Sequence, residues 1–181
     1  MRKLVSSITL LFLIAFAYAQ DIKDAHFKLS PDGKTILFIE LRLDNGDVYG
    51  INKQADIAWV KGSNGRRASI EYSDTEVKYY DKFDIHDPMG KLKSIANVIF
   101  KYNNKFDIHD VFGTLKSIGN IHISYNNTFD IHDPKGSIKS VGAVQISYFN
   151  TFDPNYLFGQ IKSIKGNSES LHVFIPLRRR T

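Results

Sequence analysis

The second half of the chain repeats itself with a period of 23 residues. Three residue types mark each of four copies: Phe83, Phe106, Phe129 and Phe152; Gly90, Gly113, Gly136 and Gly159; and Ser94, Ser117, Ser140 and Ser163. A period of this length is typical of repeat proteins, in which neighbouring copies bury each other's apolar faces and the outer copies diverge. Residues that return in every copy are therefore first candidates for a structural role.

Within each copy, apolar residues alternate along the chain with a period of two. Val98, Phe100 and Tyr102 would lie on one side of an extended strand, and Ile99 and Lys101 on the other. The same alternation returns in residues 121–125 and 144–148, with β-branched and aromatic residues on the apolar side. The fold class is therefore predicted to be all-β. Each copy is expected to hold a short strand over 91–95 and a longer strand.

Turn-forming residues separate these strands. Asp87-Pro88-Met89-Gly90 and Asp133-Pro134-Lys135-Gly136 have the composition of type I turns, and Gly119-Asn120 sits where a tight hairpin needs positive φ. We expect the longer strand to run through Tyr102 towards His109, with a bulge at 103–104; the alternative is a third turn there. The pattern predicts an antiparallel meander of repeated β-hairpins with a 23-residue period. The alternative is a parallel β-solenoid, in which equivalent residues stack about 4.8 Å apart instead of about 10 Å.

The remaining segments also have strand character. Strands are predicted over 35–43, before the turn residues Asp44-Asn45-Gly46-Asp47, and over 47–51, 56–61 and 171–175. A partial earlier copy begins near Gly65, followed by 78–82. The chain therefore divides into an N-terminal β segment (20–64), a hairpin-repeat region (65–166), and a final strand with a basic tail (167–181). We expect residues 20–181 to form one continuous domain.

The first 19 residues have the three parts of a secretory signal peptide. Arg2 and Lys3 precede a short apolar run, and Ala17-Tyr18-Ala19 provides the cleavage pattern. The sequence predicts an exported protein, periplasmic or extracellular, that begins at Gln20 and has no transmembrane segment after cleavage. Export and interspersed acidic residues argue against nucleic-acid binding. The chain has no cysteine, which excludes disulfides, thiolate zinc sites and a cysteine nucleophile.

The motif Phe-Asp-Ile-His-Asp occurs in three copies and is the most suggestive group of polar residues. Its first aspartate and its histidine would share a strand face and could present a carboxylate and an imidazole to a divalent cation. Two or three ligands per copy, separated from the next copy by a hairpin, are few for a tight site. The simpler interpretation is that the aspartates form turns and the phenylalanines anchor the core. The candidate residues are Asp84, His86, Asp107, His109, Asp130 and His132.

Recurring tyrosines form a second candidate site. Tyr102, Tyr125 and Tyr148 could form a platform for sugar rings if they were exposed in a row. They share the phase of the apolar face, however, which favours tyrosines that cap the core. Exposure of these rings would support a carbohydrate site, and burial would remove it.

No catalytic motif or cofactor fingerprint occurs in the chain. At the level of FDxxxxxGxLKSIGN, residues 65–166 resemble secreted hairpin-repeat proteins of Gram-negative bacteria that have no assigned activity. This resemblance implies an exported repeat protein and nothing about its chemistry.

We therefore expect an exported, non-enzymatic repeat protein without a cofactor, acting as a binding or structural module of the cell envelope or exterior. Its partner could be an envelope polysaccharide or protein, and its open sheet edges could form a dimer. The alternatives are a carbohydrate-binding accessory protein that uses the tyrosine row and a metal-binding repeat that uses the Asp-x-His-Asp copies.

Overall fold

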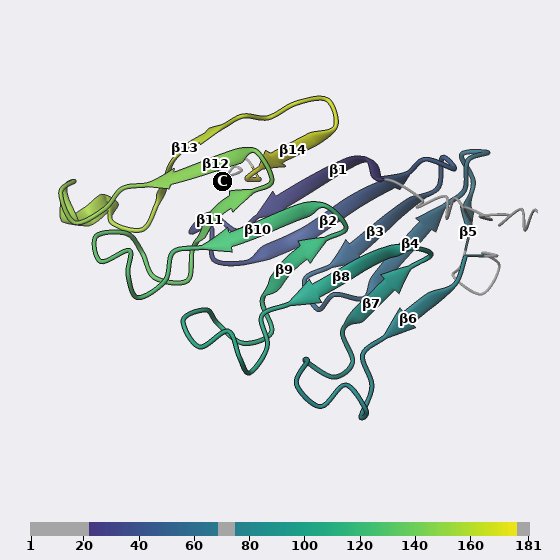
Figure 1. Ribbon diagram of the computed structural model, residues 1–181. Helices are drawn as coiled ribbons and strands as arrows, with labels where there is room; N and C mark the ends of the chain where they lie inside the picture. The colour runs from purple at the N-terminus through teal and green to yellow at the C-terminus, as the bar shows by residue number, and fades with distance from the viewer. Residues whose placement is uncertain (1–21, 69–74, 177–181) are drawn as a thin grey trace, which may run out of the picture.

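The computed structural model describes residues 22–68 and 75–176 and shows two β-sheets packed face to face (Figure 1). The first sheet has the strand order β14-β1-β2-β3-β4-β5. Its strands are β1 (Ile22–Leu29), β2 (Ile36–Leu43), β3 (Val48–Asn52), β4 (Ile57–Lys61), β5 (Arg67–Ala68) and β14 (Leu171–Phe174). The chain thus builds most of this sheet first and returns to it with its last strand.

The repeat region forms the second sheet, in the order β13-β12-β11-β10-β9-β8-β7-β6. Its strands are β6 (Val77–Tyr79), β7 (Leu92–Ile95), β8 (Val98–Tyr102), β9 (Leu115–Ile118), β10 (Ile121–Tyr125), β11 (Ile138–Val141), β12 (Val144–Tyr148) and β13 (Ile161–Lys165). A short 3₁₀ helix, η2 (Asn155–Leu157), lies between β12 and β13. Neighbours in sequence are neighbours in the sheet, as in a meander.

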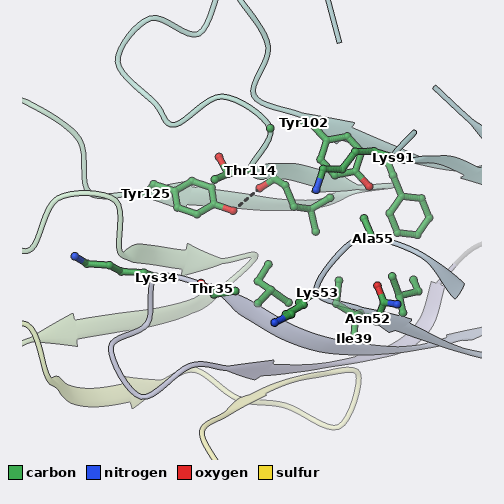
Figure 2. Close-up of a pocket in the computed structure, with 15 residues that line it drawn as sticks. Lys34, Thr35, Ile39, Asn52, Lys53, Ala55, Lys91, Tyr102, Thr114 and Tyr125 are labelled. Carbon is green, nitrogen blue, oxygen red and sulfur yellow. Dashed lines mark hydrogen bonds between the residues drawn. The ribbon is translucent and has the colours of Figure 1, made fainter. Parts of the chain in front are cut away.

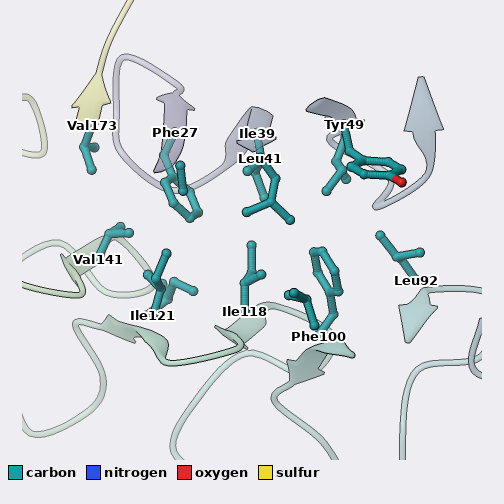
Figure 3. Packing of buried hydrophobic residues seen from close by; sticks show 14 of the residues in the cluster. Phe27, Ile39, Leu41, Tyr49, Leu92, Phe100, Ile118, Ile121, Val141 and Val173 are labelled. Carbon is teal, nitrogen blue, oxygen red and sulfur yellow. The ribbon is translucent and has the colours of Figure 1, made fainter. Parts of the chain in front are cut away.

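The core lies between the two sheets because both present their alternating apolar residues to each other. In β8, β10 and β12 every second residue is buried, and β1 and β2 show the same alternation. Figure 3 shows Phe27 and Leu41 of the first sheet facing Ile118 and Phe100 of the second. One continuous hydrophobic cluster therefore joins the N-terminal segment to the repeats.

The all-β, antiparallel prediction is confirmed, with one exception. β1 pairs in parallel with β14, so the first sheet is mixed, while the other strand pairs of the described chain are antiparallel. The parallel solenoid is therefore wrong. The hairpins repeat only in outline, because the strands joined by a tight turn share just two residue pairs, as in Ser94 with Ile99 and Ile95 with Val98.

The bulge expected at 103–104 is wrong, because β8 ends at Tyr102 and a long loop begins there. The Asn104 amide donates to Asp107 Oδ2 (2.9 Å), and Asn104 Oδ1 accepts from the Phe106 amide (3.0 Å). Such local side-chain bonds offer the backbone an alternative to the strand ladder. The third turn that the sequence left open is thus the observed conformation.

The partial copy before Phe83 is divided between the sheets. β5 pairs with β4 in the first sheet, whereas β6 pairs with β7 in the second. The strands predicted over 35–43, 47–51, 56–61 and 171–175 match β2, β3, β4 and β14 within about two residues. β1 was missed, although Ala25, Phe27 and Leu29 alternate with polar neighbours in its sequence.

Some predicted features lie outside the described residues, namely the signal peptide (1–19), Gln20 and the basic residues 178–180. Within 22–68 and 75–176, no helix has the length and hydropathy needed to cross a membrane.

Candidate binding surface

Four long loops hang from the same end of the second sheet and form the surface we call the loop row. They are residues 80–91, 103–114, 126–137 and 149–160, which connect β6–β7, β8–β9, β10–β11 and β12–β13 (Figure 1). Each loop is closed at its base by a pair of backbone bonds, such as Asn103 N–H to Thr114 O (2.8 Å) and Gly113 N–H to Asn103 O (2.7 Å). Because two strands separate successive loops, equivalent residues lie about 10 Å apart.

The first aspartate of each motif holds its own loop in shape. In the second loop, Asp107 accepts one bond from the Lys116 ammonium (2.5 Å) and another from the Asn104 amide (2.9 Å). The lysine bond and then the amide bond lower the pKa of Asp107. The same pattern holds Asp84 with Lys93, Asp130 with Lys139 and Asp153 with Lys162. These carboxylates are already committed to internal partners.

Each histidine of the motif packs against the phenylalanine of the next copy. The ring centroids are 4.6 Å apart for His86 and Phe106, 4.8 Å for His109 and Phe129, and 4.4 Å for His132 and Phe152. The aspartate and histidine of one copy therefore serve different partners. No group of three histidine or acidic side chains positioned for a metal ion occurs among the described residues. The geometry gives the metal-binding alternative no support.

The phenylalanines of the motif are on the surface, so their prediction as core anchors is wrong. Phe83, Phe106, Phe129 and Phe152 are 70–78% exposed. The physical reason is that the strand ends at the tyrosine, and the loop then carries the phenylalanine away from the sheet. The isoleucines of the motif (Ile85, Ile108 and Ile131) are also 66–79% exposed.

The tyrosines take the buried positions instead. Tyr102, Tyr125 and Tyr148 are 3–7% exposed, and burial raises their pKa values. Their hydroxyls donate to backbone carbonyls of Leu92 (3.0 Å), Leu115 (2.8 Å) and Ile138 (2.7 Å), respectively. A carbohydrate platform built from this tyrosine row is therefore wrong.

The exposed isoleucines were not among the candidate residues from the sequence. A signal for them was present, because three copies carry the same isoleucine between two polar residues of an identical motif. Met89, Val111, Phe112 and Phe158 extend the exposed apolar surface of the same loops. Soluble monomers rarely expose large apolar side chains in such a continuous series, so the loop row is the best candidate for a binding surface.

Comparison with known proteins adds no assignment to this surface. No protein-family model matches the chain, and neither does any curated protein or solved structure.

Proposed function

We propose that this chain is an exported, non-enzymatic binding protein whose loop row holds an extended β-linked polysaccharide of the cell envelope or exterior. The observation that carries the proposal is the return of the same exposed phenylalanine and isoleucine in successive loops. Packing requires a repeat protein to keep its buried residues, but it does not require identical apolar residues in water. A ligand that contacts each loop in the same way would require the same exposed residues in each loop.

The loops contain both parts of a sugar-binding surface. Exposed phenylalanine rings and isoleucine side chains can cover the apolar faces of pyranose rings. The second aspartates of the motif lie beside them, and in the first loop Asp87 Oδ1 lies 3.5 Å from Asn104 Nδ2. These carboxylates and the neighbouring lysines Lys82 and Lys105 offer hydrogen-bond partners for hydroxyl groups.

The spacing of the loops favours a β-1,4-linked chain. Equivalent residues recur at about 10 Å, twice the strand spacing, which is close to the length of one disaccharide in an extended β-1,4-linked glycan. Successive loops would therefore meet the same face of successive disaccharides. Weak contacts at each loop would add through multivalency.

Repetition also favours binding over catalysis. A catalytic centre needs one asymmetric arrangement of acid, base or nucleophile, whereas here the same aspartate and histidine recur in three loops with internal partners. Export is the other part of the proposal and rests on the signal peptide at 1–19. Expression of the full chain in a Gram-negative host should give a secreted or periplasmic protein. Its intact mass should equal that of a chain whose first residue is Gln20.

Cosedimentation with insoluble polysaccharides tests the ligand class. The exported protein should sediment with chitin and with purified peptidoglycan, both β-1,4-linked, and should stay in solution with starch granules, which are α-linked. The double variant Phe106→Ala/Phe129→Ala should lose about tenfold or more in affinity, because two neighbouring contacts of a multivalent site are removed.

A matched pair of variants separates the loop row from general hydrophobicity. Ile108→Ser should weaken binding, while Ile99→Ser, a change of the same kind on the outer face of β8 at a residue 50% exposed, should not. Equal binding to starch, equal effects of the two serine variants, or binding to lipid vesicles instead of glycans would refute the proposal.

A further inference from the structure

A cavity of about 160 Å³ lies between the two sheets, at the end that carries the loops (Figure 2). Its inner wall is apolar and includes Ile39 and Ile51 of the first sheet and Phe100 and Leu115 of the second. Lys34, Lys53 and Lys91 also line it, and they come from three different segments. None of its lining residues is acidic.

The register of the repeats explains why the cavity lies at this point. The Leu92 amide donates to Ala55 O (3.3 Å), and the Ile138 amide, two repeats further on, donates to Gly33 O (2.8 Å). Two turns of the first sheet, one before β2 and one before β4, thus dock onto the first and third repeats. Both Leu92 and Ile138 are completely buried.

Leu115 is the equivalent residue of the repeat in between, 23 positions from each of them. It is only half-buried and lines the cavity. Within the described chain, no carbonyl of the first sheet accepts a hydrogen bond from the Leu115 amide. In the first and third repeats, a carbonyl oxygen of the first sheet therefore covers this backbone edge. In the middle repeat, the same edge faces the cavity.

The lysines give the cavity a positive character. Lys91 Nζ lies 3.5 Å from Gln54 O and 5.7 Å from the centre of the Tyr102 ring, while Lys53 is exposed in the turn before β4. Figure 2 shows Lys53 and Lys91 on opposite walls. An oxygen acceptor with a negative charge fits both the backbone edge and these two ammonium groups.

The size of the cavity limits the rest of the ligand. A dry cavity of roughly 150 Å³ lined by aliphatic and aromatic side chains takes up benzene, so this one has room for one ring-sized apolar group. We propose that it binds a small aromatic carboxylate. One carboxylate oxygen accepts from the Leu115 amide, the charge is neutralised by Lys53 and Lys91, and the ring packs against Ile39, Ile51 and Phe100.

This site is separate from the polysaccharide surface. It shares with the loop row only Lys91, Gly113 and Thr114, at the bases of the loops 80–91 and 103–114, and none of the exposed phenylalanines or isoleucines lines it. A ligand bound in the cavity would connect the two sheets at the middle repeat, which lies between the repeats that the two turns contact. Ligand binding should therefore raise the stability of the folded protein.

NMR titration of the exported protein with benzoate, up to about 10 mM, tests the proposal at a concentration that saturates a millimolar site. The amide resonance of Leu115 should move downfield, and the methyl resonances of Ile39 and Ile51 should shift with the same Kd. Benzyl alcohol has a ring of the same size without the charge, and it should bind about tenfold more weakly.

Three variants complete the test. Lys53→Gln and Lys91→Gln should each raise the Kd for benzoate about threefold or more, while Lys101→Gln, the same charge change on the outer face of β8, should leave it unchanged. Thr35→Trp, at the cavity mouth, should abolish the shifts.

No shift at Leu115, equal binding of benzyl alcohol, or shifts confined to residues away from the cavity would overturn the proposal. Because the comparison of benzoate with benzyl alcohol uses the unmodified protein, a variant that fails to fold does not prevent a decision. Polysaccharide binding through the loop row predicts no difference between these two ligands, so the two proposals fail independently.

Discussion

The centroid of the His109 imidazole ring lies 4.8 Å from the centroid of the phenyl ring of Phe129, the corresponding phenylalanine of the next repeat. Two more contacts of this kind join the other loops. A solvated loop of twelve residues has few constraints of its own, but here each loop supports its neighbour. The loops therefore form one ordered surface that a single extended ligand can contact.

The first prediction concerns the exposed phenylalanines. Phe129→Ala should change the free energy of unfolding by less than about 1 kcal/mol, because the ring is 71% exposed and loses mainly its contact with His109. Ile123→Ala, at a buried position of β10, should cost about 2–4 kcal/mol because it leaves a cavity. Urea denaturation of both variants measures the difference. A larger loss for Phe129→Ala would mean that this residue is a core anchor after all.

The second prediction concerns Asp107, whose pKa is lowered from 3.8, first by the Lys116 bond and then by the Asn104 amide. A lowered pKa in the folded state stabilises the protein above the unfolded-state pKa, and this contribution is lost as the pH falls through the folded-state value. Asp107→Asn should therefore be less stable than the original protein at neutral pH, by about 0.5 kcal/mol for so exposed a pair. The difference should shrink as the pH falls below 3.8 and disappear once the pH is below the lowered folded-state pKa.

Denaturation midpoints measured at several pH values check this result. Lys116→Gln should reproduce the loss at neutral pH, and the double variant should cost little more than either single change. Additive losses would show that the two side chains do not act as a pair. A difference that persists in strong acid would contradict the assigned role of the Asp107 charge.

The sequence predicted the sheets better than it predicted the loops. Alternation in residues such as Val144, Ile146 and Tyr148 reports directly which side chains face the core, because the period of two is a property of every strand. Turn residues such as Gly119, which has φ of 53°, marked the tight turns correctly. The strand pairing of the meander followed from these two signals.

The loops were harder to predict, because a residue that recurs with the repeat need not be buried. Phe106 recurs at the phase of a core residue, but the bonds that Asn104 makes with Phe106 and with Asp107 turn the chain out of the sheet at that point. The packing of the repeats against residues 22–61 depends on contacts between distant segments. The parallel pairing of β1 with β14, which aligns His26 with His172, is one such contact that periodicity does not reveal.

The third prediction concerns the buried tyrosines. Tyr125→Phe should reduce the free energy of unfolding by about 1 kcal/mol, because it removes the hydroxyl that donates to Leu115 O and leaves a part-buried acceptor without its partner. Tyr156→Phe, at a residue 79% exposed in η2, should have no measurable effect. Polysaccharide binding should be unchanged in Tyr125→Phe. If Tyr125→Phe weakened polysaccharide binding without loss of stability, the tyrosines would have a role in binding the polysaccharide.

The fourth prediction compares one tight turn in two repeats. Ala96 and Gly119 occupy equivalent positions, with φ of 49° and 53°, and their amides donate to Glu76 O and Ile99 O at 2.8 Å. In this left-handed region an L-residue is less stable than glycine by about 1–2 kcal/mol. Glycine also increases the conformational entropy of the unfolded chain, which offsets about 0.4–1 kcal/mol of that advantage. Ala96→Gly should therefore stabilise the protein by about 0.5 kcal/mol.

The reverse change at the equivalent position should destabilise it. A Cβ atom at residue 119 would lie 3.2 Å from Ile22 Cδ1, so Gly119→Ala adds crowding to the left-handed strain and should cost about 1–2 kcal/mol. Urea midpoints at an unchanged m value report both differences. If both variants were destabilised, the second repeat's glycine and the first repeat's alanine would each be adapted to a different local packing. The turns would then be equivalent in backbone conformation but not in energy.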